Sequence, residues 1–191
     1  MAAHAPLAAP SPWVQRFAPL MPAGEVLDLA CGSGRHARLL AALGHPVLAV
    51  DRDAQALAAC AAPGVVTEQH YLEGGAPWPF PGREFAGIVV TNYLHRPLFE
   101  PLFESLAPGG VLIYETFAAG NGRFGKPSNP DFLLRTGELV EQARLFGSAL
   151  RIVAYEDGYL SQPKPAMVQR ICMVRPAGGE EDGQRWSLQG E

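Results

Sequence analysis

The sequence predicts an α/β fold in which a mostly parallel sheet is covered by helices on both faces. Apolar runs typical of buried strands alternate along the chain with stretches whose apolar residues recur at helical spacing. A glycine-rich turn, "CGSG" at 31–34, directly follows the first apolar run, as expected where a strand leads into a helix. With 191 residues, 48% of them hydrophobic, the chain is long enough for one domain with a single core.

Seven strands are expected in this sheet. Most are short and rich in Val, Leu and Ile, which is the pattern of strands buried on both faces. The last two are joined by a short loop that contains proline, so they are candidates for an antiparallel pair. The expected strands span residues 25–31, 46–51, 65–71, 85–92, 110–117, 149–157 and 166–175.

Helices are expected between most of these strands. Gly44 and the Pro63-Gly64 pair end two of them, because glycine closes helices and proline cannot continue them. "APGG" at 107–110 ends a third, and Thr136 is the expected N-cap of the last. The expected helices span residues 13–21, 33–43, 53–62, about 98–107, and a final segment with the apolar face Leu139, Val140, Ala143 and Phe146.

The two ends of the chain differ from this central domain. Residues 1–12 are rich in Ala and Pro and are expected to be flexible, while residues 177–191 contain few apolar residues and are expected to be disordered. The single domain is therefore placed at 13–176. No stretch approaches the roughly 18 apolar residues of a membrane span, and the N-terminal segment lacks the basic region of a signal peptide.

Charge and cysteine usage exclude further classes. The net charge of -4 provides no basic field, so no nucleic-acid partner is expected, and the lack of a long apolar run argues against a membrane partner. Cys31, Cys60 and Cys172 form no C-x-x-C pair, which argues against a disulfide framework and a metal site and favours a cytoplasmic location. The oligomeric state is not predicted.

Functional residues are expected beyond the carboxyl ends of the parallel strands, where ligands bind in open α/β sheets. The turn Gly32-Ser33-Gly34 precedes a helix whose free N–H groups suit a carboxylate or a phosphate. Asp51 ends the second strand, 19 residues after Gly32, where its carboxylate can accept hydrogen bonds from two ribose hydroxyls, while Asp53 is expected to cap the next helix. These features fit NAD, S-adenosylmethionine, or a tight turn that binds nothing.

Asp28 favours one of the two cofactors. A carboxylate inside a buried strand is costly unless it is satisfied, and here it can accept N–H bonds from the glycine turn or face a cationic group of a ligand. An acid so placed would repel a pyrophosphate. S-adenosylmethionine carries an ammonium and a sulfonium and no phosphate, so the carboxylate favours S-adenosylmethionine over NAD.

Two motifs carry a family resemblance. "VLDLACGSGRHA" (26–37), followed by "AVDRD" (49–53), resembles the first two motifs of class I S-adenosylmethionine-dependent methyltransferases, and "LAPGGVLIYETF" (106–117) resembles the segment that leads into their fifth strand. Residues 32–53 are similar to small bacterial methyltransferases of the tellurite-resistance type. The resemblance spans about residues 11–175. It implies a Rossmann-like doubly wound sheet of seven strands, mostly parallel with the last strand antiparallel, and S-adenosylhomocysteine as product.

The resemblance also implies a set of cofactor-binding residues at the sheet edge. They are Asp28, Ala30, Gly32, Gly34, Asp51, Arg52, Tyr71, Leu72 and Asn92. Tyr71 departs from the family, because an acid commonly stands there and bonds the adenine amino group. Glu73, two residues later, is one replacement, and the Leu72 backbone with an apolar slot is another.

The segment "TNYLHRP" (91–97) follows the fourth strand, where this fold usually brings the acceptor to the transferring methyl. Asn92, Tyr93 and His95 are therefore the predicted catalytic residues. Asn92 can donate or accept a hydrogen bond at the reacting atom, and His95 has a pKa suited to proton removal near neutrality. Tyr93 can contact the sulfonium by a cation–π interaction. A helix-start cap for His95 and core packing for Tyr93 are the alternatives.

Cations in the loop at 118–131 are candidates for binding an anionic acceptor. This segment, "AAGNGRFGKPSNPD", has the composition of a flexible lid or of a solvated surface loop. The predicted substrate-binding residues are Tyr93, His95, Arg123 and Lys126. The predicted function is methyl transfer from S-adenosylmethionine to a small-molecule nucleophile by in-line displacement. The alternatives are an NAD-dependent oxidoreductase and a non-catalytic cofactor-binding module that acts through a protein partner.

Overall fold

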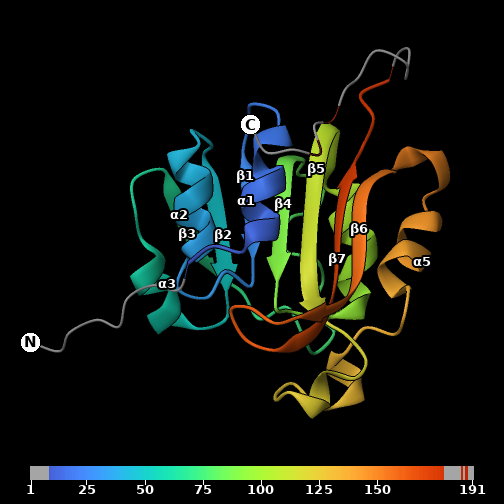
Figure 1. The fold of residues 1–191 in the computed structure, drawn as a ribbon. Helices are drawn as coiled ribbons and strands as arrows, with labels where there is room; N and C mark the ends of the chain where they lie inside the picture. Colours follow the sequence, from blue (N-terminus) through green and yellow to red (C-terminus); the bar gives the residue numbers. More distant parts are fainter. Residues whose placement is uncertain (1–8, 179–185, 187, 189–191) are drawn as a thin grey trace, which may run out of the picture.

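The computed structural model describes residues 9–178, together with residues 186 and 188. Its centre is a seven-stranded sheet with the order β3-β2-β1-β4-β5-β7-β6 (Figure 1). The first five strands are parallel, and β7 runs antiparallel to both of its neighbours. The predicted Rossmann-like fold is confirmed. The strands are β1 (Val26–Leu29), β2 (Val47–Asp51), β3 (Val65–Gln69), β4 (Phe85–Thr91), β5 (Leu106–Phe117), β6 (Arg151–Leu160) and β7 (Ala166–Val174).

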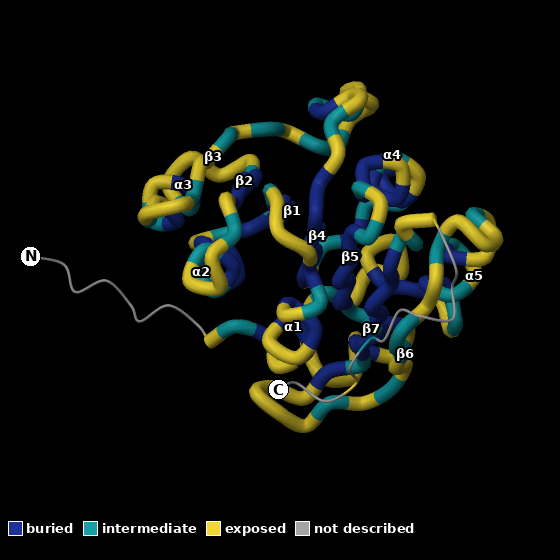
Figure 2. Tube along the Cα trace, turned by 90° about the horizontal axis from the view of Figure 1, so that it is seen from above, coloured by how far each residue is buried: buried dark blue, intermediate teal, exposed yellow. Residues whose placement is uncertain are grey.

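Helices cover both faces of this sheet (Figure 2). The first three helices pack on one face and the last two on the other. Strand alternation divides the core accordingly, so that Val26 belongs to the cluster on the first face and Leu27 to the cluster on the second. The helices are α1 (Pro12–Phe17), α2 (Arg35–Ala42), α3 (Ala54–Cys60), α4 (Phe99–Glu104) and α5 (Glu138–Arg144). No helix in the described part of the chain is long and apolar enough to cross a membrane.

Several predicted boundaries need correction. The helix predicted over 53–62 ends at Cys60, and Ala61 is already extended, in keeping with the proline at 63. The helix predicted over 98–107 is a 3-10 turn followed by α4.

The fifth strand begins earlier than predicted. β5 starts at Leu106, so the "APGG" segment lies within the strand and does not end a helix. A register shift between Phe85 and Gly87 accompanies this extension. A Cβ on Gly110 would lie 2.9 Å from the carbonyl oxygen of Phe85, so glycine permits the close approach of the two backbones.

The last helix begins without the predicted Thr136 cap. Its N-cap is Gly137, with φ +75°, and the Gly137 N–H donates to Asp157 Oδ2 at 3.2 Å. The Glu138 carboxylate reaches back and accepts the N–H of Arg135, which precedes the helix, at 2.7 Å. No side chain among the described residues caps the first turn of α5, so the predicted Thr136 cap is wrong.

The ordered domain extends further toward the N-terminus than predicted. Ser11 is buried, and its Oγ accepts the Trp13 N–H at 3.1 Å, so it caps α1. The prediction of a flexible segment is thus wrong for Ser11 and Pro12, while residues 1–8 lie outside the described part. Most of the predicted tail also lies outside it, although the Arg151 guanidinium is 4.5 Å from the centroid of the Trp186 ring.

Candidate active site

A cavity of about 510 Å³ opens where β1, β2 and β4 end. This size is within the range of small-molecule sites. It is called the Asp51 cavity below, and its walls contain several predicted cofactor-binding residues: Ala30, Gly32, Asp51, Arg52, Tyr71, Leu72 and Asn92. Glu73 and Tyr93, for which the sequence offered a cofactor contact as one alternative, also line it, and the remaining wall residues are Cys31, Ser33, Arg35, His70 and Thr91.

Asp51 holds the glycine turn at one side of this cavity. Its Oδ2 accepts the Gly32 N–H at 2.8 Å, and its Oδ1 accepts the Asp53 N–H at 3.0 Å. Each carboxylate oxygen can accept a further hydrogen bond, so both remain available to ligand hydroxyls. Asp53 instead caps α3 by accepting two backbone N–H groups. The two neighbouring acids therefore have the separate positions that the sequence predicted.

Asp28 lies behind the turn and does not line the cavity. It is on the α2 side of β1, with 1% of its surface exposed, and its Oδ2 has no hydrogen-bond partner among the described residues. The hydrogen bond that braces the turn comes from Asp51, which corrects the bracing role predicted for Asp28. The pKa of the Asp28 carboxyl is raised to about 8. Burial is the main cause, and the nearby Cys60 side chain is a smaller second cause.

Replacing Asp28 with asparagine is expected to flatten the dependence of stability on pH. The folded protein keeps this carboxyl protonated up to about pH 8, while the ordinary pKa of an aspartate side chain is 3.8. Because the folded state then binds more protons, stability falls as pH rises from about 4 to about 8, by at most roughly 1.4 kcal/mol per pH unit. Urea unfolding at several pH values between these limits measures the slope. Parallel profiles for the unaltered protein and Asp28→Asn would contradict the assignment.

Gly34, also predicted to bind the cofactor, is required by packing. Its φ is +82°, and a Cβ there would overlap the Cys60 Sγ and lie 3.0 Å from the Cys60 Cα. Glycine thus allows the start of α2 to approach the end of α3. A Cβ on Gly32 would meet nothing within 4 Å, so only its φ of +53° favours glycine there.

Two non-glycine residues with left-handed backbone lie in the cavity wall. Ala30 and Asn92 both have φ +55°, and they are the only non-glycine residues with positive φ in the described ranges. Each such residue costs on the order of 1–3 kcal/mol and persists when its surroundings hold it. The Asn92 N–H donates to the Glu115 carbonyl oxygen at 2.9 Å. Strained backbone of this kind concentrates at functional sites, which supports the choice of this cavity.

Tyr93 contributes to both the core and the cavity. Its ring packs against the apolar cluster under α4, and its carbonyl oxygen accepts a hydrogen bond from Tyr114 Oη at 2.7 Å. Its own hydroxyl is buried without a hydrogen-bond partner in the described part of the chain. Burial raises the pKa of the Tyr93 phenol, and the Glu73 carboxylate adds to the increase.

His95 lies outside the Asp51 cavity, although it was predicted as a catalytic and substrate-binding residue. It occupies the N-cap position of the 3-10 turn Arg96–Leu98, and its side chain makes no capping hydrogen bond there. The structure therefore shows neither the predicted contact with the cavity nor the alternative side-chain cap.

Tyr71, which stands at the position of the usual family acid, and Glu73 both line the cavity. Tyr71 is 60% exposed, and Glu73 lies beside it in the wall. Arg52 Nη1 is 3.9 Å from Glu73 Oε2. The sequence indicated Glu73 as one replacement for the acid that bonds the adenine amino group. His70 also lines the cavity, but apart from its place after β3 nothing in the sequence marked it as a site residue.

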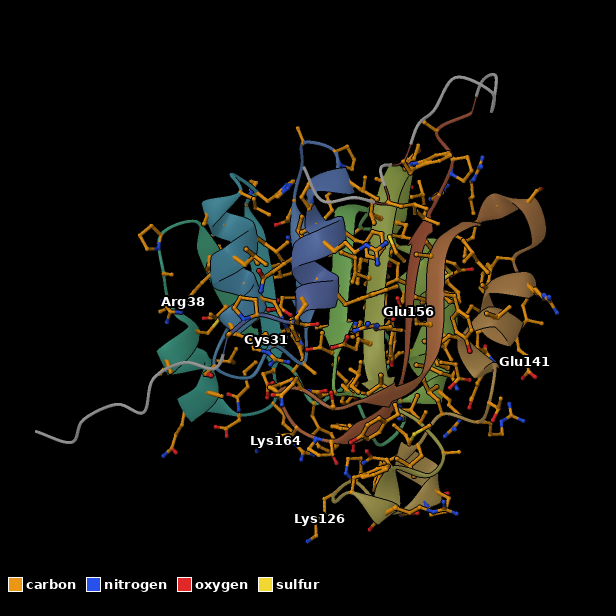
Figure 3. All side chains as sticks on the ribbon, viewed as in Figure 1. Cys31, Arg38, Lys126, Glu141, Glu156 and Lys164 are labelled. Atoms are coloured by element: carbon orange, nitrogen blue, oxygen red, sulfur yellow. The ribbon has the colours of Figure 1, made fainter. Side chains whose placement is uncertain are left out.

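The loop predicted to be a lid forms a folded lobe below β5 (Figure 1). Asn121 is buried, its Nδ2 donates to the Pro127 carbonyl oxygen at 2.9 Å, and its Oδ1 accepts the Met167 N–H at 3.1 Å. Arg123 lines a second cavity of about 340 Å³ in this lobe. Lys126 does not line it and lies at the outer tip of the lobe, pointing away from the sheet (Figure 3). The two predicted cations therefore do not share one pocket.

An ion pair missed from the sequence ties this lobe to the segment after β4. Arg96 donates to both oxygens of Glu138, at 2.6 and 3.0 Å, and to the carbonyl oxygens of Asp131 and Leu133. Burial alone would raise the pKa of the Glu138 carboxyl, but hydrogen bonds from Arg96 and Arg135 lower it below its usual value. The partners lie 42 residues apart in the chain, so neither has a local sequence signal.

The sheet order, the glycine turn after β1 and the acid at the end of β2 define a class of protein. This is the fold of the class I S-adenosylmethionine-dependent methyltransferases. The chain belongs to the family of proteins with a methyltransferase domain, and the match covers residues 1–156.

Solved methyltransferases share this fold. TehB from Haemophilus influenzae aligns with a TM-score of 0.63 and 18% identity, covering 83% of this chain and 59% of that chain. The glycopeptide N-methyltransferase MtfA complexed with S-adenosylmethionine aligns with a TM-score of 0.58 and 18% identity, covering 85% of this chain and 86% of that chain. The family match confirms the predicted resemblance and the predicted cofactor class, and the solved structures confirm the fold.

Curated relatives match about half of the chain. The protein-L-isoaspartate O-methyltransferase of Chlorobaculum tepidum is 37% identical over 99 residues, covering 49% of this chain and 45% of the relative. The trans-aconitate 2-methyltransferase of Delftia acidovorans is 35% identical over 103 residues, covering 49% of this chain and 38% of the relative. The chain thus spans less than half the length of these relatives.

Proposed function

We propose that this chain is a methyltransferase that binds S-adenosylmethionine in the Asp51 cavity and releases S-adenosylhomocysteine. The observation that carries the proposal is the Asp51 carboxylate, which is oriented by two backbone N–H groups beside the glycine turn. In this assignment Asp51 holds the ribose hydroxyls, and residues 30–33 hold the methionine end. The wall formed by Arg52, Tyr71 and Leu72 holds the adenine, with Glu73 available to its amino group.

The residues after β4 are proposed to position the acceptor. The bound cofactor supplies an electrophilic methyl group that an in-line nucleophile displaces from sulfur. The chain then needs chiefly to align the acceptor and exclude water, which can lower a barrier by up to about 7–11 kcal/mol. Asn92 and Tyr93 are in the cavity wall and carry this role, while the position of His95 outside it gives no support to a general base.

The acceptor is proposed to be a small molecule with an anionic group. Arg123 lines the second cavity and takes part in no ion pair among the described residues. Arg135, the other cation of that cavity, lies within ion-pair distance of Glu138 and Glu141. The names of the two curated relatives denote carboxylate-bearing substrates, which agrees with a free guanidinium at this place.

Arg123→Gln is expected to lower kcat/KM for a carboxylate acceptor by about 10- to 100-fold, because one charge-assisted hydrogen bond is worth roughly 1.5–3 kcal/mol. The assay follows S-adenosylhomocysteine formation over a panel of carboxylate, thiol and amine acceptors that includes trans-aconitate. Arg144→Gln, an exposed arginine on α5, is the matched control and should leave the rate unchanged. Equal rates in both variants for the best acceptor would remove Arg123 from the site. Cofactor binding with no turnover on any acceptor would favour the non-catalytic alternative.

A further inference from the structure

A ring of buried hydrogen bonds lies behind the Asp51 cavity and joins four parts of the fold. Its members are Ser11 at the start of α1, His36 on α2, Thr91 at the end of β4 and Glu115 on β5. Each has less than a tenth of its surface exposed. Of these four, only Thr91 is in the cavity wall. The ring therefore connects the cavity to the first described residues of the chain.

The hydrogen bonds determine the tautomer of His36. Its Nε2 accepts the Ser11 N–H at 3.1 Å and therefore carries no proton. In the neutral ring, Nδ1 carries the proton and donates it to Thr91 Oγ1 at 3.3 Å. Burial lowers the pKa of His36 to about 3, with the Arg35 charge as a second cause, so the ring is neutral at physiological pH.

The ring closes around the strained end of β4. Ser11 Oγ donates to Glu115 Oε1 at 2.9 Å, and the Glu115 carbonyl oxygen accepts the N–H of Asn92 at 2.9 Å. The peptide that joins Thr91 to Asn92 is thus held from both sides, through the Thr91 hydroxyl and the Asn92 N–H. Asn92 has φ +55°, a conformation that a non-glycine residue leaves when its surroundings do not hold it.

We propose that Ser11 and His36 are positioning residues for the Asp51 cavity. They do not line it, but they hold Thr91 and Asn92 in the conformation that forms its wall. When these hydrogen bonds are lost, the wall of the cavity can leave this conformation. Cofactor affinity then falls, while the sheet and its hydrophobic core stay folded. The inference rests on the proposed cofactor site. It adds Ser11, at the start of α1, to the residues on which cofactor binding depends.

The test is calorimetric titration of the full chain with S-adenosylhomocysteine at about 25 °C. Ser11→Ala removes the hydrogen bond to Glu115. His36→Ala removes the hydrogen bonds of the imidazole to Ser11 and to Thr91. Each variant is expected to bind S-adenosylhomocysteine about tenfold more weakly or worse. His36→Gln, whose side-chain oxygen can still accept the Ser11 N–H, is expected to recover part of the affinity. His36→Met fills a similar volume without an amide oxygen to accept the Ser11 N–H, so a recovery seen with glutamine and absent with methionine is an effect that packing alone does not produce.

Ser105→Ala is the matched control. Ser105 is also a buried serine with a side-chain hydrogen bond, since its Oγ accepts from Trp78 Nε1 at 3.1 Å, but it precedes β5 at the opposite edge of the sheet. It is expected to lower the melting temperature, because it also loses a buried hydrogen bond, and to leave affinity within about twofold.

Affinity unchanged in both Ser11→Ala and His36→Ala would overturn the proposal, as would an equal loss of affinity in Ser105→Ala. A parallel titration of Asp51→Ala separates the two claims. If Asp51→Ala loses binding while Ser11→Ala and His36→Ala retain it, the positioning role is wrong and the proposed cofactor site is supported. If Asp51→Ala binds normally, the cofactor site itself is misplaced.

Discussion

Replacing Asp51 with alanine is expected to weaken the binding of S-adenosylhomocysteine by at least about 100-fold. The change removes the acceptor of two ligand hydroxyl bonds, each worth roughly 1.5–3 kcal/mol when charge-assisted. It also releases the Gly32 N–H from Asp51 Oδ2, so the turn loses its brace. Titration calorimetry measures the dissociation constant, and the melting temperature checks that the variant is folded.

Asp53→Ala is the control for this substitution. Asp53 is two residues away and carries the same charge, but its Oδ1 caps α3 by accepting the N–H groups of Gln55 and Ala56. Loss of a helix N-cap costs about 0.5–2 kcal/mol of stability, so this variant is expected to melt earlier and bind nearly normally. Similar binding losses in the two variants would show that charge or stability, and not the Asp51 contact, determines affinity.

Replacing Arg96 with methionine is expected to destabilise the protein by about 1.5–3 kcal/mol, because the Glu138 carboxylate loses its charge-assisted hydrogen bonds from Arg96 and keeps only Arg135 as a charged partner. Glu138 is fully buried, and Arg96 donates to both of its oxygens. The same change releases the carbonyl oxygens of Asp131 and Leu133, which hold the lobe that contains Arg123. Urea unfolding measures the loss of stability.

Two further variants give this prediction its controls. Arg83→Met breaks a pair with Glu25 in which both side chains are more than a third exposed, and it is expected to cost about 0–1 kcal/mol. The double variant Arg96→Met/Glu138→Leu removes the stranded carboxylate and should recover much of the stability lost in Arg96→Met. A loss in Arg96→Met no larger than in Arg83→Met would mean that the buried pair does not anchor the lobe.

Local signals in the sequence were sufficient for the fold and for the position of Asp51 at the cavity. The strand periodicity and the glycine turn predicted the sheet, and the position of Asp51 at the end of its strand placed it at the correct edge. These inferences depend on residue spacing within one strand–turn–helix unit, where the short connection allows few arrangements of the strand and the helix.

The same signals could not decide which groups around the turn meet a ligand. Asp28 and Gly34 belong to the motif, but the structure places Asp28 under α2 and Gly34 against Cys60. Strand alternation gave a hint for Asp28, since it shares a face with Val26 and so points toward a helix.

Contacts between distant segments escaped the sequence altogether. Ser11 bonds to Glu115 across 104 residues, and Arg96 bonds to Glu138 across 42. Ser11 was assigned to a flexible end because its neighbours are Ala and Pro, yet tertiary hydrogen bonds make it part of the buried network. Composition indicates whether an isolated segment is flexible. It does not show which distant residues will bind the segment and order it in the folded protein.

The central claim is that the Asp51 cavity holds S-adenosylmethionine, and one calorimetric experiment tests it most directly. The unaltered chain and Asp51→Ala are each titrated with S-adenosylhomocysteine and with NAD. Binding of S-adenosylhomocysteine to the unaltered chain alone, with no heat from NAD, is the predicted result. Binding of NAD without S-adenosylhomocysteine, or undiminished binding of S-adenosylhomocysteine to Asp51→Ala, would contradict it.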